Sequence, residues 1–224
     1  MQHPLDNPIW SALTTDHMSF AVGEAGWKRY PAPVAPFAAV PDEAANRLAP
    51  RSLASRDSIC FVGALPTFDD AWVVEHRFDL LQMVLPREQR ASGGSLIACR
   101  ELTQLDVAPM VDLTDRVFPG YFRPRTYLMG RYLGIFAESK LVAMAGERMT
   151  LEGWCEISAV CTDPGYTGRG YAQALVRLLV DAMFERSVTP FLHVSPENMR
   201  ARALYRMLGF VERATLPFIR VHSA

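Results

Sequence analysis

The chain has 224 residues, and 50% of them are hydrophobic, which is enough for one large core or two small ones. Its 23 basic and 24 acidic side chains leave a net charge of −1, and no run of lysine or arginine indicates a nucleic-acid partner. No apolar stretch is long enough to span a membrane and the first residues are polar, so we expect a cytoplasmic protein without a membrane partner.

The cysteines and histidines do not indicate a metal centre. None of the cysteines belongs to a Cys-x-x-Cys pair, and each lies in an apolar, strand-like run. The five histidines are scattered, and His193 is expected to be a hydrogen-bonded core residue in a buried strand. The four cysteines, which we expect to be buried and reduced, are Cys60, Cys99, Cys155 and Cys161.

Residues 1–94 are predicted to form a small α+β unit without a chemical motif. The stretch 87–95 is charged and then rich in glycine and serine, which is typical of a linker. We therefore predict a domain boundary between 1–94 and 95–224, and the first unit is a candidate for a degenerate copy of the second. Two helices and two strands are predicted in the first unit, at 6–13, 41–48, 58–65 and 80–85.

The second unit is predicted to begin with a short strand near 96–99 and a helix over 105–118, whose apolar side chains roughly follow the i, i+3, i+4 rule. A proline–glycine pair at 119–120 ends this helix. The following connection, 121–129, is aromatic and basic. A β-hairpin is predicted over 132–149, because two apolar runs flank the polar turn Glu-Ser-Lys.

A strand over 154–162 is predicted to lead into a glycine-containing loop and then a helix. Strand, glycine turn and helix start is the arrangement that binds phosphate, because the first N–H groups of the helix are unpaired and its dipole favours an anion. Strict alternation along the strand would place its residues on two faces: Cys155, Ile157, Ala159 and Cys161 on one, and Trp154, Glu156, Ser158, Val160 and Thr162 on the other.

Three nucleotide-binding motifs share this arrangement, and the residues exclude two of them. The Rossmann motif fails because Gln173 replaces its last glycine, and the P-loop fails because Tyr171 and Ala172 replace its Lys and Ser/Thr. The segment Thr167-Gly-Arg-Gly-Tyr-Ala is instead similar to the pyrophosphate loop Arg/Gln-x-x-Gly-x-Gly/Ala of the GNAT N-acetyltransferase superfamily. Thr167 departs from the usual Arg or Gln. A glycine loop with only a structural role is the alternative.

A second stretch carries the same resemblance. Residues 198–210 match the superfamily's Asn-x-x-Ala-x-x-Leu-Tyr-x-x-x-Gly-Phe at every fixed position. Between the two motifs, an apolar stripe predicts a helix from Tyr171, and 190–194 predicts a strand parallel to 154–162. The resemblance implies an α+β fold of α/β/α layers, with a mixed, mostly antiparallel twisted sheet, helices on both faces, and a smaller α+β unit in front.

The resemblance also implies acetyl-CoA as co-substrate, without a metal. The loop would donate N–H groups to the pyrophosphate, and the strand before it would pair with the pantetheine arm, provided that it splays away from the strand at 190–194. The implied cofactor-binding residues are Val160, Cys161, Thr162, Gly168, Arg169, Gly170, Tyr171, Ala172 and Asn198.

Two residues are candidates for the proton transfers that acetylation of an amine requires. Glu156 is the candidate base, because the resemblance implies that its strand lies in the middle of the sheet, where a carboxylate is partly desolvated and its pKa should rise. Glu147 is the second choice, and a structural Glu156 paired with an arginine is the alternative. Tyr205 is the candidate acid for the leaving thiolate, with a core tyrosine as the alternative.

The acceptor is expected to be the amine of a small molecule or peptide, attacked directly in a ternary complex. In the superfamily the connection after the first helix overhangs the acceptor, so Phe118, Tyr121 and Phe122 are candidate acceptor-binding residues, with core aromatics as the alternative. A sensor that binds acyl-CoA without turnover and a transferase for longer acyl groups are the alternative functions. A homodimer is one option for assembly.

Overall fold

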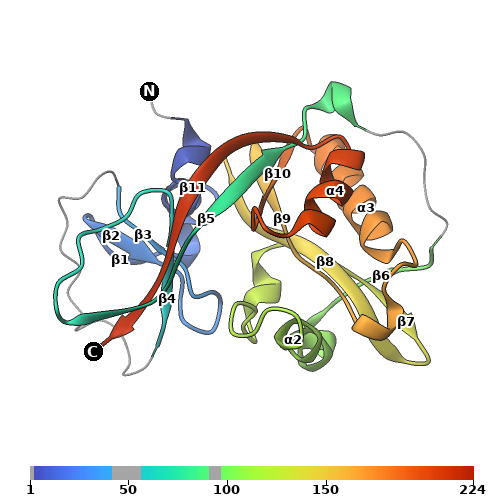
Figure 1. Cartoon of the computed structure of the whole chain (residues 1–224), viewed down its shortest axis with the longest axis horizontal. Coiled ribbons are helices and arrows are strands. Elements are labelled where there is room, and N and C mark those ends of the chain that lie inside the picture. The colour runs from blue at the N-terminus through green and yellow to red at the C-terminus, as the bar shows by residue number, and fades with distance from the viewer. Residues whose placement is uncertain (1–2, 42–56, 91–96) are drawn as a thin grey trace.

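The computed structural model describes residues 3–41, 57–90 and 97–224, which form a large sheet flanked by helices (Figure 1). In this part of the chain the sheet has eight strands in the order β4-β11-β5-β10-β9-β8-β7-β6, and only β9 and β10 are parallel neighbours. The predicted α+β class with a mostly antiparallel sheet is confirmed. The strands are β4 (Ile59–Val62), β5 (Trp72–Val84), β6 (Arg100–Glu101), β7 (Tyr132–Ala137), β8 (Lys140–Leu151), β9 (Trp154–Thr162), β10 (Thr189–Val194) and β11 (Val211–Ser223).

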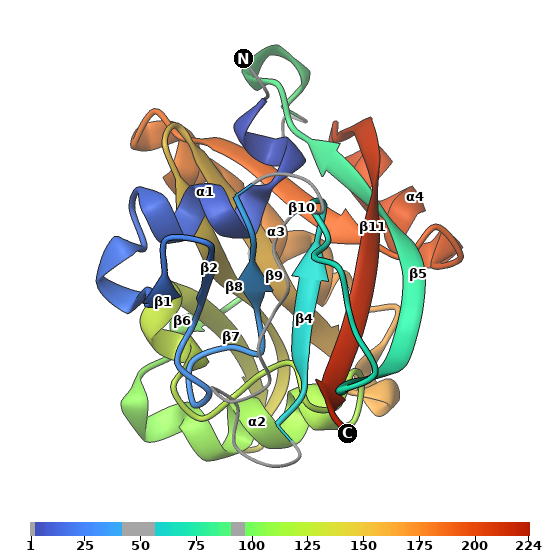
Figure 2. The ribbon, with the colours of Figure 1, turned by 90° about the vertical axis from the view of Figure 1, so that its left-hand side faces the viewer.

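Helices cover both faces of the sheet, as the family resemblance implies. α3 (Tyr171–Glu185) packs on β8 and β9 from one side, with α4 (Met199–Met207) beside it (Figure 1). α1 (Pro8–Thr14) and α2 (Val107–Asp115) lie on the opposite side (Figure 2). None of the helices in the described part is long and apolar enough to cross a membrane.

The apolar stripe of α3 forms the centre of the largest core cluster. The stripe faces the sheet because its members recur every three or four residues, and each fully buried side chain contributes about 1.5–3 kcal/mol. The side chains of the stripe with no exposed surface are Leu175, Val176, Leu179 and Met183. This packing fixes the direction of α3, and therefore the position of its N-terminus at the glycine loop.

Residues before the main sheet form a small layer of their own. α1 lies close to the predicted helix, and a small sheet follows, of β1 (Val22–Glu24), β2 (Trp27–Arg29) and β3 (Ala38–Ala39). Beyond Pro41, the helix predicted at 41–48 lies outside the described residues, and so does most of the predicted linker. The strand expected near 96–99 is found slightly later, as β6. In the described residues of 1–94, α1 is the only α-helix, and they contain no second strand–helix–strand unit.

Strand β5 joins the two predicted units in one sheet. It pairs with β11 along its whole length, from Trp72 to Val84, and its last part also pairs with β10 through Leu81 to Val84. β4 pairs with the other edge of β11. A strand of 1–94 thus lies between two strands of 95–224. This pairing argues against independent folding of the predicted domains, because without β5 both neighbours would expose unpaired backbone groups.

A β-bulge in β9 reverses the predicted alternation. Ser158 pairs with Gly146 and Cys161 pairs with Met144, so two residues of β9 lie opposite a single residue of β8. The first of them, Ala159, has a φ of 52°, in the left-handed region. As a result Ile157 packs with the α3 cluster, whereas Ala159 and Cys161 pack with α2. The expectation that these residues share one face was wrong, because the extra residue shifts the period of two.

Strands β9 and β10 separate after a short parallel pairing. They are paired only from Trp154 to Glu156 on β9 and from Thr189 to Phe191 on β10. Beyond these residues the facing edges of the two strands are free, which is the splay that the family resemblance requires. A gap between two central strands gives a ligand access to backbone groups in the middle of the sheet.

Candidate active site

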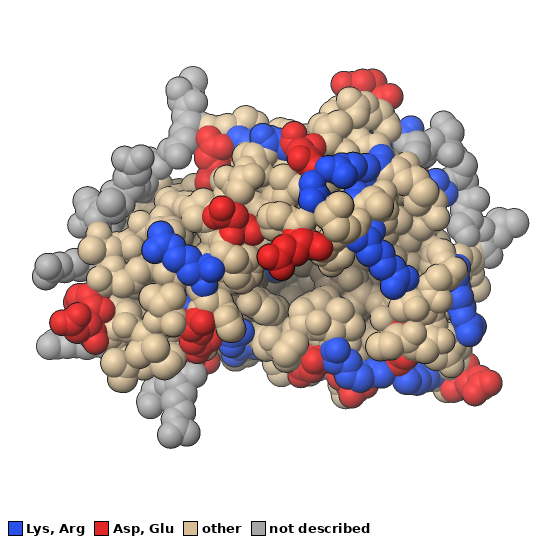
Figure 3. Space-filling view, in the orientation of Figure 1, with Lys and Arg blue, Asp and Glu red and all other residues tan. Residues whose placement is uncertain are grey.

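Two cavities meet at the point where β9 and β10 separate. The first, of about 350 Å³, lies along the glycine loop, and the second, of about 340 Å³, lies between the splayed strands and the first 80 residues. Figure 3 shows this face of the molecule hollowed near its centre, with basic and acidic side chains mixed around it. The cavities form a continuous cleft, because they share five lining residues: Val117, Val160, Asn198, Ala201 and Tyr205.

The glycine loop presents open backbone to the first cavity. Gly168 and Gly170 have φ values of 80° and 75°, and nothing lies within 4 Å of the position that a Cβ would occupy on either. Gly170 is the N-cap of α3 and no side chain caps this helix, so its first N–H groups are available to an anion. Arg169 and Arg200 also line the cavity. The residues present therefore fit a pyrophosphate, and every residue predicted to bind the cofactor lines this cavity.

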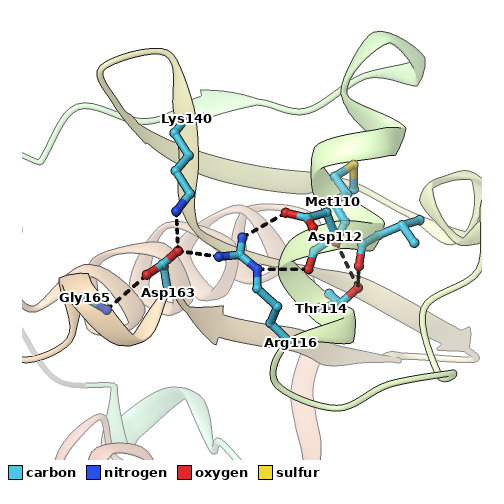
Figure 4. Close-up of polar contacts among 8 residues, drawn as sticks. Met110, Asp112, Thr114, Arg116, Lys140, Asp163 and Gly165 are labelled. Carbon is cyan, nitrogen blue, oxygen red and sulfur yellow. Dashed lines mark hydrogen bonds and ion pairs between the residues drawn. The ribbon is translucent and has the colours of Figure 1, made fainter.

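Asp163 holds the start of the loop in place (Figure 4). Its Oδ1 accepts from the Gly165 amide (3.0 Å), and its Oδ2 accepts from Arg116 of the α2 end (2.6 Å) and Lys140 of the β7–β8 hairpin (2.8 Å). The hydrogen bonds from Lys140 and Gly165, together with Arg116, lower the pKa of Asp163 to about 2. The sequence analysis missed this anchor, because its two cationic partners, Arg116 and Lys140, come from distant segments. Thr167, which stands where the family motif has Arg or Gln, donates its hydroxyl to the nearby Pro164 carbonyl (3.2 Å).

Substitution of Gly170 by valine should remove most of the affinity for CoA. Its left-handed φ disfavours an L side chain by about 1–2 kcal/mol, and the added methyl groups would occupy the open space of the anion site. We expect calorimetry to show at least about a tenfold weaker Kd, which corresponds to 1.4 kcal/mol. Gly153→Val is the matched control, because Gly153 also has a φ of 75° and open surroundings but lines neither cavity. Equal CoA affinity in both variants would refute the anion site.

Glu156 is held in a buried ion pair. Arg148 binds it with two nitrogens, Nε to Oε2 (2.7 Å) and Nη2 to Oε1 (2.6 Å), and Nδ1 of His193 lies 2.8 Å from Oε1. Burial raises the pKa of Glu156, but Arg148 and His193 outweigh it and lower the pKa to about 2. The expectation of a raised pKa was therefore wrong, because desolvation is offset by a bidentate cation. The alternative weighed from the sequence, a glutamate paired with an arginine, is what the structure contains.

The arginine partner follows from the register of the β8–β9 hairpin. Glu147 pairs with Ile157 and Thr150 pairs with Cys155, so β8 has an extra residue and Arg148 comes to lie beside Glu156. The predicted strands could have suggested that Arg148 and Glu156 lie near each other. They could not have predicted the bidentate geometry of the ion pair. Glu147 itself binds Arg186, the C-cap residue of α3 (2.5 Å), is buried, and does not line the cleft.

His193 is fixed from both sides of its ring. Its Nδ1 faces Glu156, and its Nε2 lies 3.0 Å from Nε2 of Gln82. The Gln82 amide also donates to the Leu5 carbonyl (2.9 Å) and accepts from Arg213 (2.6 Å), which defines its orientation. The imidazole therefore accepts from Gln82 and donates to Glu156. His193 lines the second cavity, but neither ring nitrogen is free to take a proton from a substrate.

Tyr205 lies where the two cavities meet. Its side chain is buried on α4 and stacks edge-on against Phe210, with ring centroids 5.8 Å apart. Burial raises the pKa of Tyr205, which keeps its hydroxyl protonated at neutral pH. No hydrogen-bond partner for this hydroxyl is found among the described residues. Asn198 caps α4 by accepting from the Ala201 amide (3.0 Å), and its own amide group remains available to a ligand.

The second cavity has mainly aromatic and aliphatic walls. Phe118, Tyr121 and Phe122, predicted from the resemblance, all line it. The sequence analysis missed two of its polar lining residues, Tyr132 and Arg148. It also missed the wall contributed by the first 80 residues, which nothing in their local pattern indicates. The residues of this wall are Phe37, Val62, Phe78 and Leu80.

Comparisons with known proteins agree on one family. Residues 132–219 match the family model described as FR47-like protein. The N-alpha-acetyltransferase RimI of Mycobacterium tuberculosis (strain ATCC 25618 / H37Rv) is 32% identical over 120 residues, which are 49% of this chain and 75% of the relative. A GNAT-family protein of known structure from Novosphingobium aromaticivorans DSM 12444 is 29% identical, with a TM-score of 0.86 and 100% coverage of both chains.

More distant structures share the fold. An acetyltransferase of the GNAT family from Colwellia psychrerythraea has a TM-score of 0.53 and 13% identity, covering 68% of this chain and 57% of that one. This likeness concerns the fold alone. The Novosphingobium protein, in contrast, matches from end to end, so its similarity includes the first 94 residues as well as the region of the two motifs.

Proposed function

Because this chain belongs to the GNAT N-acetyltransferase family, we propose that it transfers an acetyl group from acetyl-CoA to a primary amine by direct attack in a ternary complex. The observation that carries this proposal is the continuous cleft, which has an open anion loop at one end, an apolar cavity at the other, and Tyr205 between them. Acetyl-CoA would supply the activated thioester. The glycine loop would hold its pyrophosphate, and Asn198 and the free edge of β9 would hold the arm.

The acceptor amine is expected to react in its neutral form. Among the described residues that line the second cavity there is no aspartate or glutamate, so a bound ammonium group would have no counter-ion. The predicted base, Glu156, is ionised and bonded to Arg148, and both ring nitrogens of His193 are in use. We assign Glu156 a positioning role: it holds Arg148 and His193 at the cavity wall. The proton of the amine would then leave to water.

An α-amino group meets this requirement better than a lysine side chain. Its pKa is about 7.7–8.0, compared with about 10.4 for lysine, so a far larger fraction is neutral at physiological pH. The name of the mycobacterial relative, an N-alpha-acetyltransferase, supports the same choice. We therefore propose an α-amine, on a small molecule or at a peptide N-terminus, as the acceptor.

The test is thiol release from acetyl-CoA with a panel of amines. We expect peptides with a free α-amine to react at least about tenfold faster near pH 7.5 than N-acetylated peptides with a single lysine, because of the difference in neutral fraction. The rate with α-amines should rise with pH, reach half of its maximum near the amine pKa of about 7.7–8.0, and level off about one pH unit above it. Equal rates for both amines would contradict the α-amine assignment. An absence of thiol release with every amine would favour a CoA-binding sensor.

A further inference from the structure

Tyr132 lines the second cavity and has a buried hydroxyl without a partner among the described residues. Its side chain is 1% exposed, and no hydrogen-bond partner for the hydroxyl is found among the described residues. Such a group costs about 1–3 kcal/mol when it stays unpaired, so a ligand that pairs with it regains this energy. Burial raises the pKa of Tyr132, and the hydroxyl is therefore available as a donor. Gly146 leaves room for the ring, since a Cβ there would lie 2.0 Å from it.

Arg148 provides a second donor to the same cavity. Its Nε and Nη2 bind Glu156, which leaves the N–H groups of Nη1 for a ligand. The guanidinium also lies over the Phe37 ring, 4.5 Å from its centroid, so its position is fixed before a ligand binds. Because Glu156 already neutralises the charge of Arg148, the remaining N–H groups suit a neutral oxygen better than a second carboxylate, which would add an unbalanced buried charge.

The remaining wall of the cavity suits a large apolar group. Aromatic rings come from segments that are far apart in the sequence, and the volume of about 340 Å³ is large enough for an aromatic side chain. The rings are Phe37, Phe78, Phe118, Tyr121, Phe122 and Phe218.

We propose that Tyr132 and Arg148 bind the carbonyl oxygen next to the acceptor's α-amine, and that the aromatic wall receives a large apolar side chain on the same residue. This inference rests on the proposed acetyl transfer and specifies its acceptor: a neutral α-amino carbonyl compound, such as an amino-acid amide or the N-terminal residue of a peptide. Two donors on one oxygen would hold the carbonyl in place. Because the α-amine is covalently fixed relative to that carbonyl, this directs the amine toward Tyr205 and the thioester.

The experiment compares acceptors with and without the carbonyl. Phenylalaninamide, alaninamide, 2-phenylethylamine and the peptide Phe-Ala-Gly are assayed by thiol release with wild-type protein, Tyr132→Phe and Tyr127→Phe. Tyr127 is the matched control, because it is half-buried nearby but does not line the cavity. We expect Tyr132→Phe to lower kcat/KM for phenylalaninamide about 5- to 10-fold, as for one lost hydrogen bond, and to leave 2-phenylethylamine unchanged. The melting temperature should not fall, because the hydroxyl has no partner to lose.

Each result bears on a separate part of the inference. Equal effects of Tyr132→Phe on phenylalaninamide and 2-phenylethylamine, or no effect on either, would overturn the carbonyl site. Alaninamide reacting as well as phenylalaninamide would overturn the apolar side-chain site. A higher kcat/KM for Phe-Ala-Gly than for phenylalaninamide identifies a peptide as the source of this chemistry, and the reverse identifies a small amide. If no amine releases thiol from the wild-type protein, the acetyl transfer itself is refuted, and this inference falls with it.

Discussion

Replacing Tyr205 with phenylalanine should lower the rate of acetyl transfer by about 10²-fold or more, which is within the usual range for a positioned general acid. The hydroxyl lies where the two cavities meet, has no partner among the described residues and stays protonated because burial raises the pKa of Tyr205. A leaving thiolate whose conjugate acid has a pKa of about 8–9 needs such a donor. The affinity for CoA, measured by calorimetry, should stay nearly constant because the pyrophosphate loop is unchanged.

The Tyr205 substitution also separates catalysis from packing. The exchange removes one hydroxyl and almost no volume, so the edge-on contact with Phe210 is retained and the fold should be preserved. Tyr127→Phe again serves as the control for a tyrosine outside the cleft and should keep wild-type kinetics. If Tyr205→Phe transfers acetyl groups at the wild-type rate, Tyr205 is a core residue only, and water or another group protonates the thiolate.

Replacing Glu156 with glutamine should lower the free energy of unfolding by about 3–5 kcal/mol, the typical cost of removing one partner of a buried ion pair. Glu156 has no exposed surface and binds Arg148 with both oxygens, so the variant would leave a cation buried without a counter-ion. Urea denaturation measures the loss. The double variant Arg148→Met with Glu156→Gln removes the unpaired charge and should regain most of the lost stability. If the double variant is as unstable as the single one, the pair does not account for the effect.

The pH dependence of stability should change in the same variant. The folded-state pKa of Glu156, about 2, lies below its ordinary value of 4.5, so the ionised carboxylate stabilises the native state above about pH 4.5. This contribution is lost as the pH falls from 4.5 toward 2, and Glu156→Gln should lack that part of the acid destabilisation.

Kinetics of the same variant test the alternative role of Glu156. If it were the base, the rate deficit of Glu156→Gln would shrink as the pH approaches the pKa of the amine. A positioning role predicts a rate deficit that does not depend on pH in this range.

Several parts of this protein could be predicted from short segments of its sequence. The glycine loop and the start of α3 follow from backbone conformations that a few neighbouring residues specify. The hairpin of β7 and β8 likewise follows from two apolar runs around a polar turn. The two motifs identified the family because their fixed residues have local geometric tasks, and every residue predicted from them to bind the cofactor lines one cavity.

Other features depend on contacts between distant segments and became visible only in the folded chain. No local pattern places β5 between β10 and β11, because strand order is set by packing across the whole sheet. One extra residue at Ala159 reversed the faces of β9, since alternation has a period of two and a bulge shifts it. The ionisation of Glu156 depended on Arg148 across the hairpin rather than on burial alone. Most of the second cavity could not be predicted for the same reason: its walls come from segments that only the folded chain brings together.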